Sequence, residues 1–169
     1  LIVLFYLLLK PVNRHLALIA TVFNGVQTSV LVANKLVLLV PLLLASQTAA
    51  LASMPPPVSG SLTALAVAMH GHGFGIGLVF FGLACVIRGY LVIGSTYFPA
   101  ALGVFLVAAG VGYLVNSAAL LLAPALASAL FPWVLIPALV GELAMSLWLI
   151  ARGGDSDFEF PPGLNPTRA

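Results

Sequence analysis

Four polar side chains are expected at a similar depth inside apolar segments, where a polar group without a partner is costly. They are Lys35, His70, Asn116 and Glu142. At about 1.5 Å per residue from the expected outer helix ends, all four lie roughly 9 to 16 Å deep, so we expect one buried polar cluster. Glu142 is the only acid in an apolar segment. We predict that it is hydrogen-bonded to His70 or Lys35, or is protonated.

Such a cluster has three functional interpretations. Glu142 and His70 could be the protonatable pair of a small-solute or proton-coupled transporter. His70 could instead ligate haem or a chlorophyll-type pigment, although His72 points about 200° away on the same helix and could not be a second ligand. The third interpretation is structural, because polar groups of this kind often only hold helices together.

Enzyme motifs are absent from the sequence. There is no His-Glu-x-x-His, no Gly-x-Ser-x-Gly and no pair of carboxylates, so we predict no catalytic residue, no metal site and no resident cofactor. The protein is expected not to be an enzyme.

Amide side chains mark one face of the second apolar segment. Asn24, Gln27 and Asn34 fall within a wedge of about 120° at 100° per residue. We expect this face to look into a helix bundle.

Glycines are spaced for close helix packing on two segments. The run from His70 to Gly77 has glycine at alternate positions, but neither a preceding strand nor Gly-Lys-Ser/Thr indicates a phosphate loop. Small residues four or seven apart instead let helices approach closely in lipid. The predicted packing glycines are Gly71, Gly73, Gly75, Gly77, Gly103 and Gly110. The leading hypothesis is therefore an accessory or structural subunit that packs against other membrane proteins or itself.

The composition defines the elements that carry these residues. Of 169 residues, 62% are apolar and 6% are charged, which excludes an ordinary soluble fold. We predict an all-α, up-and-down bundle of about five transmembrane segments, of which the first is truncated. The predicted segments are 1–9, 15–44, 61–87, 100–122 and 131–151, within a bundle of residues 1–152. Residues 153–169 are expected to be a disordered polar tail.

Proline and glycine set the expected breaks. Pro41 should kink or end the second segment. Met54 to Gly60 and Ala123 to Leu130 should be loops, and Arg88-Gly89-Tyr90 should close the third segment.

Basic residues orient the bundle in a cell (inner) membrane. The segments place Lys10, Arg14, Arg88, Arg152 and Arg168 on one side, which is expected to be cytoplasmic together with the tail. Arg88 is interpreted as an interfacial anchor. The net charge of +2 is too thinly spread for nucleic acid binding, so the expected partners are lipid and other membrane proteins.

Several blocks along the chain resemble a bacterial membrane family known as domain of unknown function 4386. The resemblance rests on Lys10 to Arg14, His70 to Tyr90, Gly110 to Ser117, Gly141 to Leu143 and Trp148 to Ile150. It covers most of the chain from Leu1 to Gly153. It implies a six-span protein, of which one helix and part of another would precede Leu1, and it brings no assigned activity.

Overall fold

The fold is a bundle of α-helices, described by a computed structural model for residues 1–46 and 54–153. No strand occurs within these two stretches. Four helical stretches are long and apolar enough to cross a membrane, namely Arg14–Ala45, Pro56–Ile93, Ala100–Leu122 and Trp133–Arg152. The predicted all-α membrane bundle is confirmed. The first predicted segment is a short helix, α1 (Ile2–Leu9), and the predicted tail beyond residue 153 lies outside the described residues.

The second segment is interrupted where proline chemistry requires it. Helix α2 (Arg14–Lys35) begins after Asn13, whose side chain accepts hydrogen bonds from two main-chain N–H groups of the first turn. A 3₁₀ turn, η1 (Leu36–Leu38), then separates α2 from α3 (Leu39–Ala45). Pro41 lies within α3, and a proline ring clashes with the carbonyl group four residues earlier. The distortion expected at Pro41 therefore falls just before it.

The third segment is longer than predicted at both ends. Helix α4 runs over Pro56–Ile93, so Pro56 to Gly60 are helical and not part of a loop. Prolines fit the first turn of a helix, where the missing N–H group would have no intrahelical partner. At the other end α4 passes through Arg88-Gly89-Tyr90 without stopping, because the bare backbone at Gly89 packs directly on α5.

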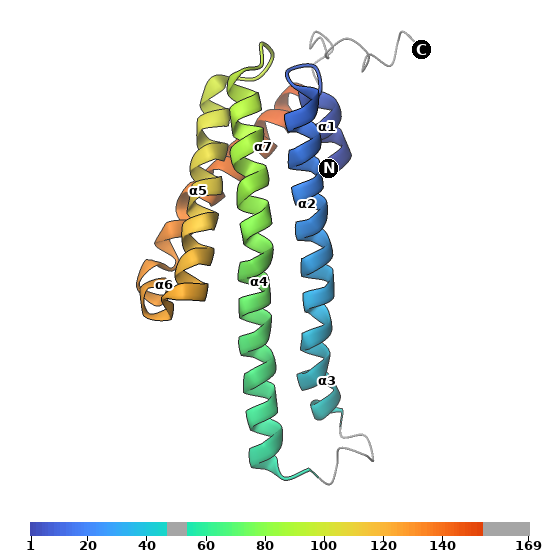
Figure 1. Cartoon of the computed structure of the whole chain (residues 1–169), viewed down its shortest axis with the longest axis vertical. Helices are drawn as coiled ribbons and strands as arrows, with labels where there is room; N and C mark the ends of the chain where they lie inside the picture. Colours follow the sequence, from blue (N-terminus) through green and yellow to red (C-terminus); the bar gives the residue numbers. More distant parts are fainter. Residues whose placement is uncertain (47–53, 154–169) are drawn as a thin grey trace.

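The last two spans form a compact hairpin. Helix α5 (Ala100–Leu122) is followed by α6 (Pro124–Leu130), which replaces the loop predicted over Ala123–Leu130. A 3₁₀ turn, η2 (Trp133–Leu135), leads into α7 (Ile136–Gly153). Figure 1 shows α6 near the middle of α4, so that α5 and α7 flank only the half of α4 nearest its C-terminal end. The ends of the spans are therefore not level.

The core lies in this half of the molecule, where α1, α2, α4, α5 and α7 meet. Its buried residues include Leu9 of α1, Ala17 of α2, Val92 of α4, Leu106 of α5 and Met145 of α7. The short α1 helix thus completes the packing around the C-terminal half of α4. The polar groups described below lie next to this core.

Glycines let the backbones of α4 and α5 touch. A Cβ atom added to Gly103 would lie 2.6 Å from the Gly89 carbonyl oxygen, and one added to Gly110 would lie 2.6 Å from the Gly82 carbonyl oxygen. Gly103 and Gly110 thus make the predicted close approach, and Gly82 and Gly89 are their partners, which the sequence reasoning did not single out. We call these four residues the glycine seam.

The glycines between His70 and Phe80 divide between two neighbours. Gly73 and Gly77 face the Asn34 and Leu31 side chains of α2, whereas Gly75 faces the Leu120 side chain of α5. Gly71 packs against no neighbour within the described chain, since no atom lies within 4 Å of an added Cβ there. Gly71 lies one turn beyond Gly75, near the point where α5 ends.

Candidate functional site

Arg88 is a buried cation in the interior of the bundle. Its side chain is 5% exposed, and its Nη2 donates a 2.6 Å hydrogen bond to Oδ1 of Asn24 on α2. Its guanidinium carbon lies 4.9 Å from the centre of the Phe5 ring on α1. The interpretation of Arg88 as an interfacial anchor is wrong, because α4 continues to Ile93 and leaves Arg88 more than one turn inside the helix end.

Asn24 connects Arg88 to the polar face of α2. Its Nδ2 donates a 2.8 Å hydrogen bond to Oε1 of Gln27, and its main-chain oxygen accepts one of 2.9 Å from the Thr28 hydroxyl. Asn24 and Asn34 are both buried, and Gln27 is half-buried. The predicted inward orientation of this face thus agrees with the structure, and the face supplies the partner for the buried guanidinium.

Glu142 on α7 binds a residue that the sequence reasoning overlooked. Its Oε1 accepts a 2.5 Å hydrogen bond from the Tyr113 hydroxyl of α5. The Tyr113 ring packs against Phe81 of α4 with ring centres 5.3 Å apart. The predicted bond from Glu142 to His70 or Lys35 is therefore corrected. A tyrosine hydroxyl inside an apolar helix was the signal that could have indicated this partner.

A partly open cavity of about 280 Å³ lies between α1, α2, α4, α5 and α7. Arg88 and Glu142 both line it, from different helices. Cys85 and Asn24 in its wall are buried, whereas Thr28 and Ser146 are exposed and mark its mouth. The remaining lining residues are Leu1, Ile2, Phe5, Phe81, Leu106 and Met145. We call this site the Arg88 cavity.

The two charges of the Arg88 cavity do not form an ion pair. Glu142 is the one acid in residues 1–46 and 54–153, and none of its oxygens lies within 4.0 Å of an Arg88 nitrogen. A guanidinium group has five N–H donors, and within the described chain the bond to Asn24 is its single hydrogen bond. A buried cation with so few partners can accept further groups from a bound molecule.

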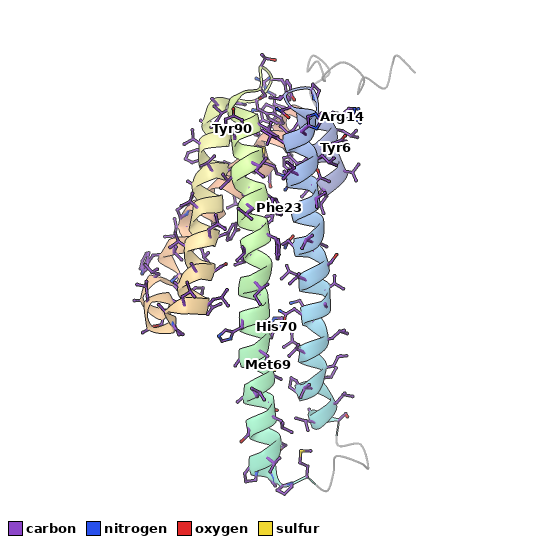
Figure 2. All side chains as sticks on the ribbon, viewed as in Figure 1. Tyr6, Arg14, Phe23, Met69, His70 and Tyr90 are labelled. Atoms are coloured by element: carbon purple, nitrogen blue, oxygen red, sulfur yellow. The ribbon has the colours of Figure 1, made fainter. Side chains whose placement is uncertain are left out.

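His70 belongs to a separate contact between α4 and α2. Its main-chain oxygen accepts a 2.9 Å hydrogen bond from Nδ2 of Asn34, and its Nδ1 lies 3.3 Å from the main-chain oxygen of Asn34. Gly73 leaves room for the Asn34 amide, which occupies the place of a Cβ atom. His70 and Arg88 are about 27 Å apart along α4 at 1.5 Å per residue, and Figure 2 shows His70 far from the end that carries Tyr90.

The predicted four-residue cluster is therefore not assembled. Lys35 is exposed, Asn116 is half-buried on α5, and Glu142 lies at the level of Phe81 to Arg88. The depth estimate assumed that all spans start at one outer boundary, but α5 and α7 reach only about halfway along α4 (Figure 1). Glu142 is consequently displaced toward the opposite end of α4 from His70.

The comparisons with known proteins concern the whole described bundle. The family model described as domain of unknown function DUF4386 matches residues 1–153. This agrees with the resemblance drawn from the sequence blocks. No curated protein matches the chain, and no solved structure matches it.

Proposed function

The chain belongs to the DUF4386 family, and we propose that it is a transporter-class membrane protein that binds a small polar solute in the Arg88 cavity. Ionisable residues inside a membrane bundle usually mark a ligand or ion pathway. The observation that carries the proposal is the placement of Arg88 and Glu142 on two walls of one cavity, without an ion pair between them. Sites of this kind commonly lie between the helices of a bundle.

This proposal changes one member of the expected charged pair. Glu142 keeps the role inferred from the sequence, but His70 is bonded to Asn34 in another part of the bundle. Arg88 takes its place, since it is the cation that shares a cavity with Glu142. A proton relay between Glu142 and His70 is therefore not part of the proposal.

The basic residues support a cell-membrane location with this end of the bundle in the cytoplasm. Lys10 and Arg14 lie at the turn between α1 and α2, and Arg152 lies in the last turn of α7. Figures 1 and 2 place the turn after α1 and the end of α4 at the same end of the bundle. Basic residues at helix ends are retained on the cytoplasmic side, and the Arg88 cavity would then lie in the cytoplasmic half.

Cysteine labelling tests whether water reaches this cavity. Cys85 is the single cysteine of the chain, so a Cys85→Ala background gives a clean start. Ser146→Cys places a thiol at the mouth, and Leu147→Cys places one on the neighbouring residue, which is exposed on α7 but outside the cavity. A membrane-impermeant thiosulfonate reagent should label Ser146→Cys in proteoliposomes at least about tenfold faster than Leu147→Cys.

Equal protection of both positions would overturn the proposal. It would mean that lipid fills the mouth and that solute from water has no access. Labelling of both positions at the same rate would also contradict it, because the cavity would then provide no special path.

An accessory subunit is the second candidate, favoured by a different observation. Gly60, Ala64, Ala68 and Gly71 form an exposed row of small residues on α4, suited to close approach of another helix. The glycine seam cannot serve a partner, because α5 already covers it. Native mass measurement in mild detergent should detect a complex that Ala68→Leu weakens, and a monomer without partners would argue against this candidate.

A further inference from the structure

We propose that the solute of the Arg88 cavity is a zwitterion with an apolar body, bound with its anionic group at Arg88 and its ammonium group at Glu142. This inference rests on the proposed function and specifies its substrate class. It follows from the charges on the two walls, from the donors and acceptors that remain, and from the character of the other lining residues.

The Arg88 wall is suited to an anion. Arg88 is buried, and the hydrogen bond of its guanidinium to Asn24 leaves most of the N–H donors to the cavity. Asn24 is a neutral amide, so it orients the cation without cancelling its charge. Carboxylate and phosphate oxygens are the groups that match the planar fork of donors in a guanidinium.

The Glu142 wall is suited to a cationic donor. Tyr113 donates to Oε1, and a carboxylate has about four acceptor positions in all. The Tyr113 bond therefore holds the carboxylate in place and leaves acceptors for an ammonium group. Ser146 lies one turn further along α7 and also lines the cavity, where its hydroxyl can accept a further N–H bond.

The rest of the lining is suited to an apolar body. Phe5, Phe81, Leu106 and Met145 lie between or beside the two charged walls. The cavity volume of about 280 Å³ is near the lower end of the range of small-molecule sites, roughly 300 to 1,000 Å³. One positive and one negative wall sum to no net charge, so a ligand with both charges neutralises each wall, whereas an ion of one sign leaves the other wall uncompensated.

Two sources can supply this chemistry. A free amino acid with an apolar side chain carries a carboxylate and an ammonium group, and a zwitterionic lipid headgroup carries a phosphate and an ammonium group. Both would place an oxyanion at Arg88 and a cation at Glu142. The experiment below separates them.

A matched series of four solutes tests the inference on the purified full chain. The four solutes share a branched apolar chain and differ in charge. Leucine carries both charges, 4-methylpentanoate only the negative charge, 3-methylbutylamine only the positive charge, and 4-methylpentanamide none. Thermal unfolding in detergent at increasing concentrations should show that leucine binds about ten- to a hundredfold more tightly than the others, the worth of one charge-assisted contact.

Variants assign each charge to its wall. Arg88→Gln should lower the affinity for 4-methylpentanoate but not for 3-methylbutylamine, and Glu142→Gln should do the reverse. Arg14→Gln is the matched control, because Arg14 is exposed on α2 and should leave both affinities unchanged. The wild-type series decides the question even where a variant fails to fold.

Bilayer composition distinguishes the two sources. The zwitterionic headgroup predicts that phosphatidylethanolamine nanodiscs protect Ser146→Cys from labelling and weaken leucine binding, relative to phosphatidylglycerol nanodiscs. A free amino acid as the source predicts that leucine protects Ser146→Cys from labelling in both kinds of nanodisc. Equal binding of all four solutes, or no binding by any of them together with no lipid effect, would overturn the zwitterion inference. Rapid labelling of Ser146→Cys with equal binding would leave the proposed function standing and remove only this inference.

Discussion

At the residue scale, one tyrosine joins the α4–α5 connection to the first helix. The Tyr97 hydroxyl donates a hydrogen bond to the main-chain oxygen of Leu8, at the C-terminal end of α1. The neighbouring Phe98 ring packs on Trp148 of α7 with ring centres 4.7 Å apart. Tyr97 lies outside the membrane-spanning helices, and its partial burial raises the pKa of its hydroxyl above the usual 10.0.

Tyr97→Phe should lower the free energy of unfolding by about 0.5 to 1.5 kcal/mol at neutral pH, the usual worth of such a bond. Because the pKa of Tyr97 is higher in the folded state, its contribution is complete below the unfolded pKa of about 10 and is lost as pH rises through the folded value. Unfolding of both proteins in detergent between neutral and strongly alkaline pH checks this. The two stabilities should converge only above the folded-state pKa of Tyr97, which is higher than 10.

The control for this prediction is Tyr90→Phe. The Tyr90 side chain is 65% exposed on α4, so its removal should change neither the stability nor its alkaline dependence. A constant difference between wild type and Tyr97→Phe across the whole range would contradict the account of Tyr97.

Sequence periodicity predicted which side chains turn inward but not which of them meet. The orientation of Asn24 and Asn34 follows from 100° per residue, and both are buried. Their partners, Arg88 and the main chain of His70, depend on how far α2 slides along α4. That offset depends on the residues at which each helix begins and ends. Turn-forming residues in the sequence do not determine these helix ends. For the same reason, the sequence did not predict that Glu142 would contact Tyr113.

At the scale of elements, α4 is the helix against which α2 and α5 are positioned. The glycine seam pairs Gly82 with Gly110 and Gly89 with Gly103, seven residues apart on each helix. Two contacts two turns apart fix both the separation and the register of α4 and α5. They therefore also position Tyr113 of α5, the partner of Glu142, against Phe81 of α4.

Gly110→Val should strongly destabilise the protein. Its Cβ would lie 2.6 Å from the Gly82 carbonyl oxygen and 2.8 Å from the Val86 nitrogen, and backbone atoms cannot yield unless the helices separate. We expect a loss of at least about 1 to 3 kcal/mol, as for other overpacked interiors, measured by unfolding in detergent.

Gly71→Ala serves as the comparison for this seam. No atom lies near the added Cβ, and alanine is favoured over glycine in a helix by about 0.5 to 1 kcal/mol. Gly71→Ala should therefore leave stability unchanged or raise it. If both substitutions had the same effect, close packing at the glycine seam would not be what holds α5 in place.

Helix existence was predictable from composition, whereas the helix ends were not. Apolar length alone indicated the four spans now described. Prolines were interpreted as breaks, yet Pro56 and Pro124 lie in first turns, where proline is well accommodated. Arg88 was interpreted as a boundary because charges usually lie at helix ends in membranes. Its burial against Asn24 depends on contacts between helices, which are not visible in the pattern of one segment.

At the scale of the whole molecule, five helices surround the Arg88 cavity beside the core. The α5–α6–α7 hairpin covers the half of α4 that carries Arg88, while α2 and α3 run beside α4 along most of its length (Figure 1). Glu142, Tyr113, Arg88 and Asn24 come from four different helices, and Phe5 of α1 covers the guanidinium. The central claim is that this polar arrangement exists to bind a solute and not to hold the fold together.

Replacing the buried pair by apolar residues tests this claim most directly. The double variant Asn24→Leu/Arg88→Met removes both partners of the 2.6 Å hydrogen bond, so neither is left buried and unpaired. Stability is measured by unfolding in detergent without solute, with Arg14→Met as the control for the loss of an exposed charge. A cation held for a ligand destabilises the empty protein, and apolar replacement of buried ionic groups is often neutral or stabilising by about 1 to 4 kcal/mol. We expect unchanged or higher stability together with loss of solute binding, whereas a loss of about 3 to 5 kcal/mol would show that the pair serves the fold and would contradict the account.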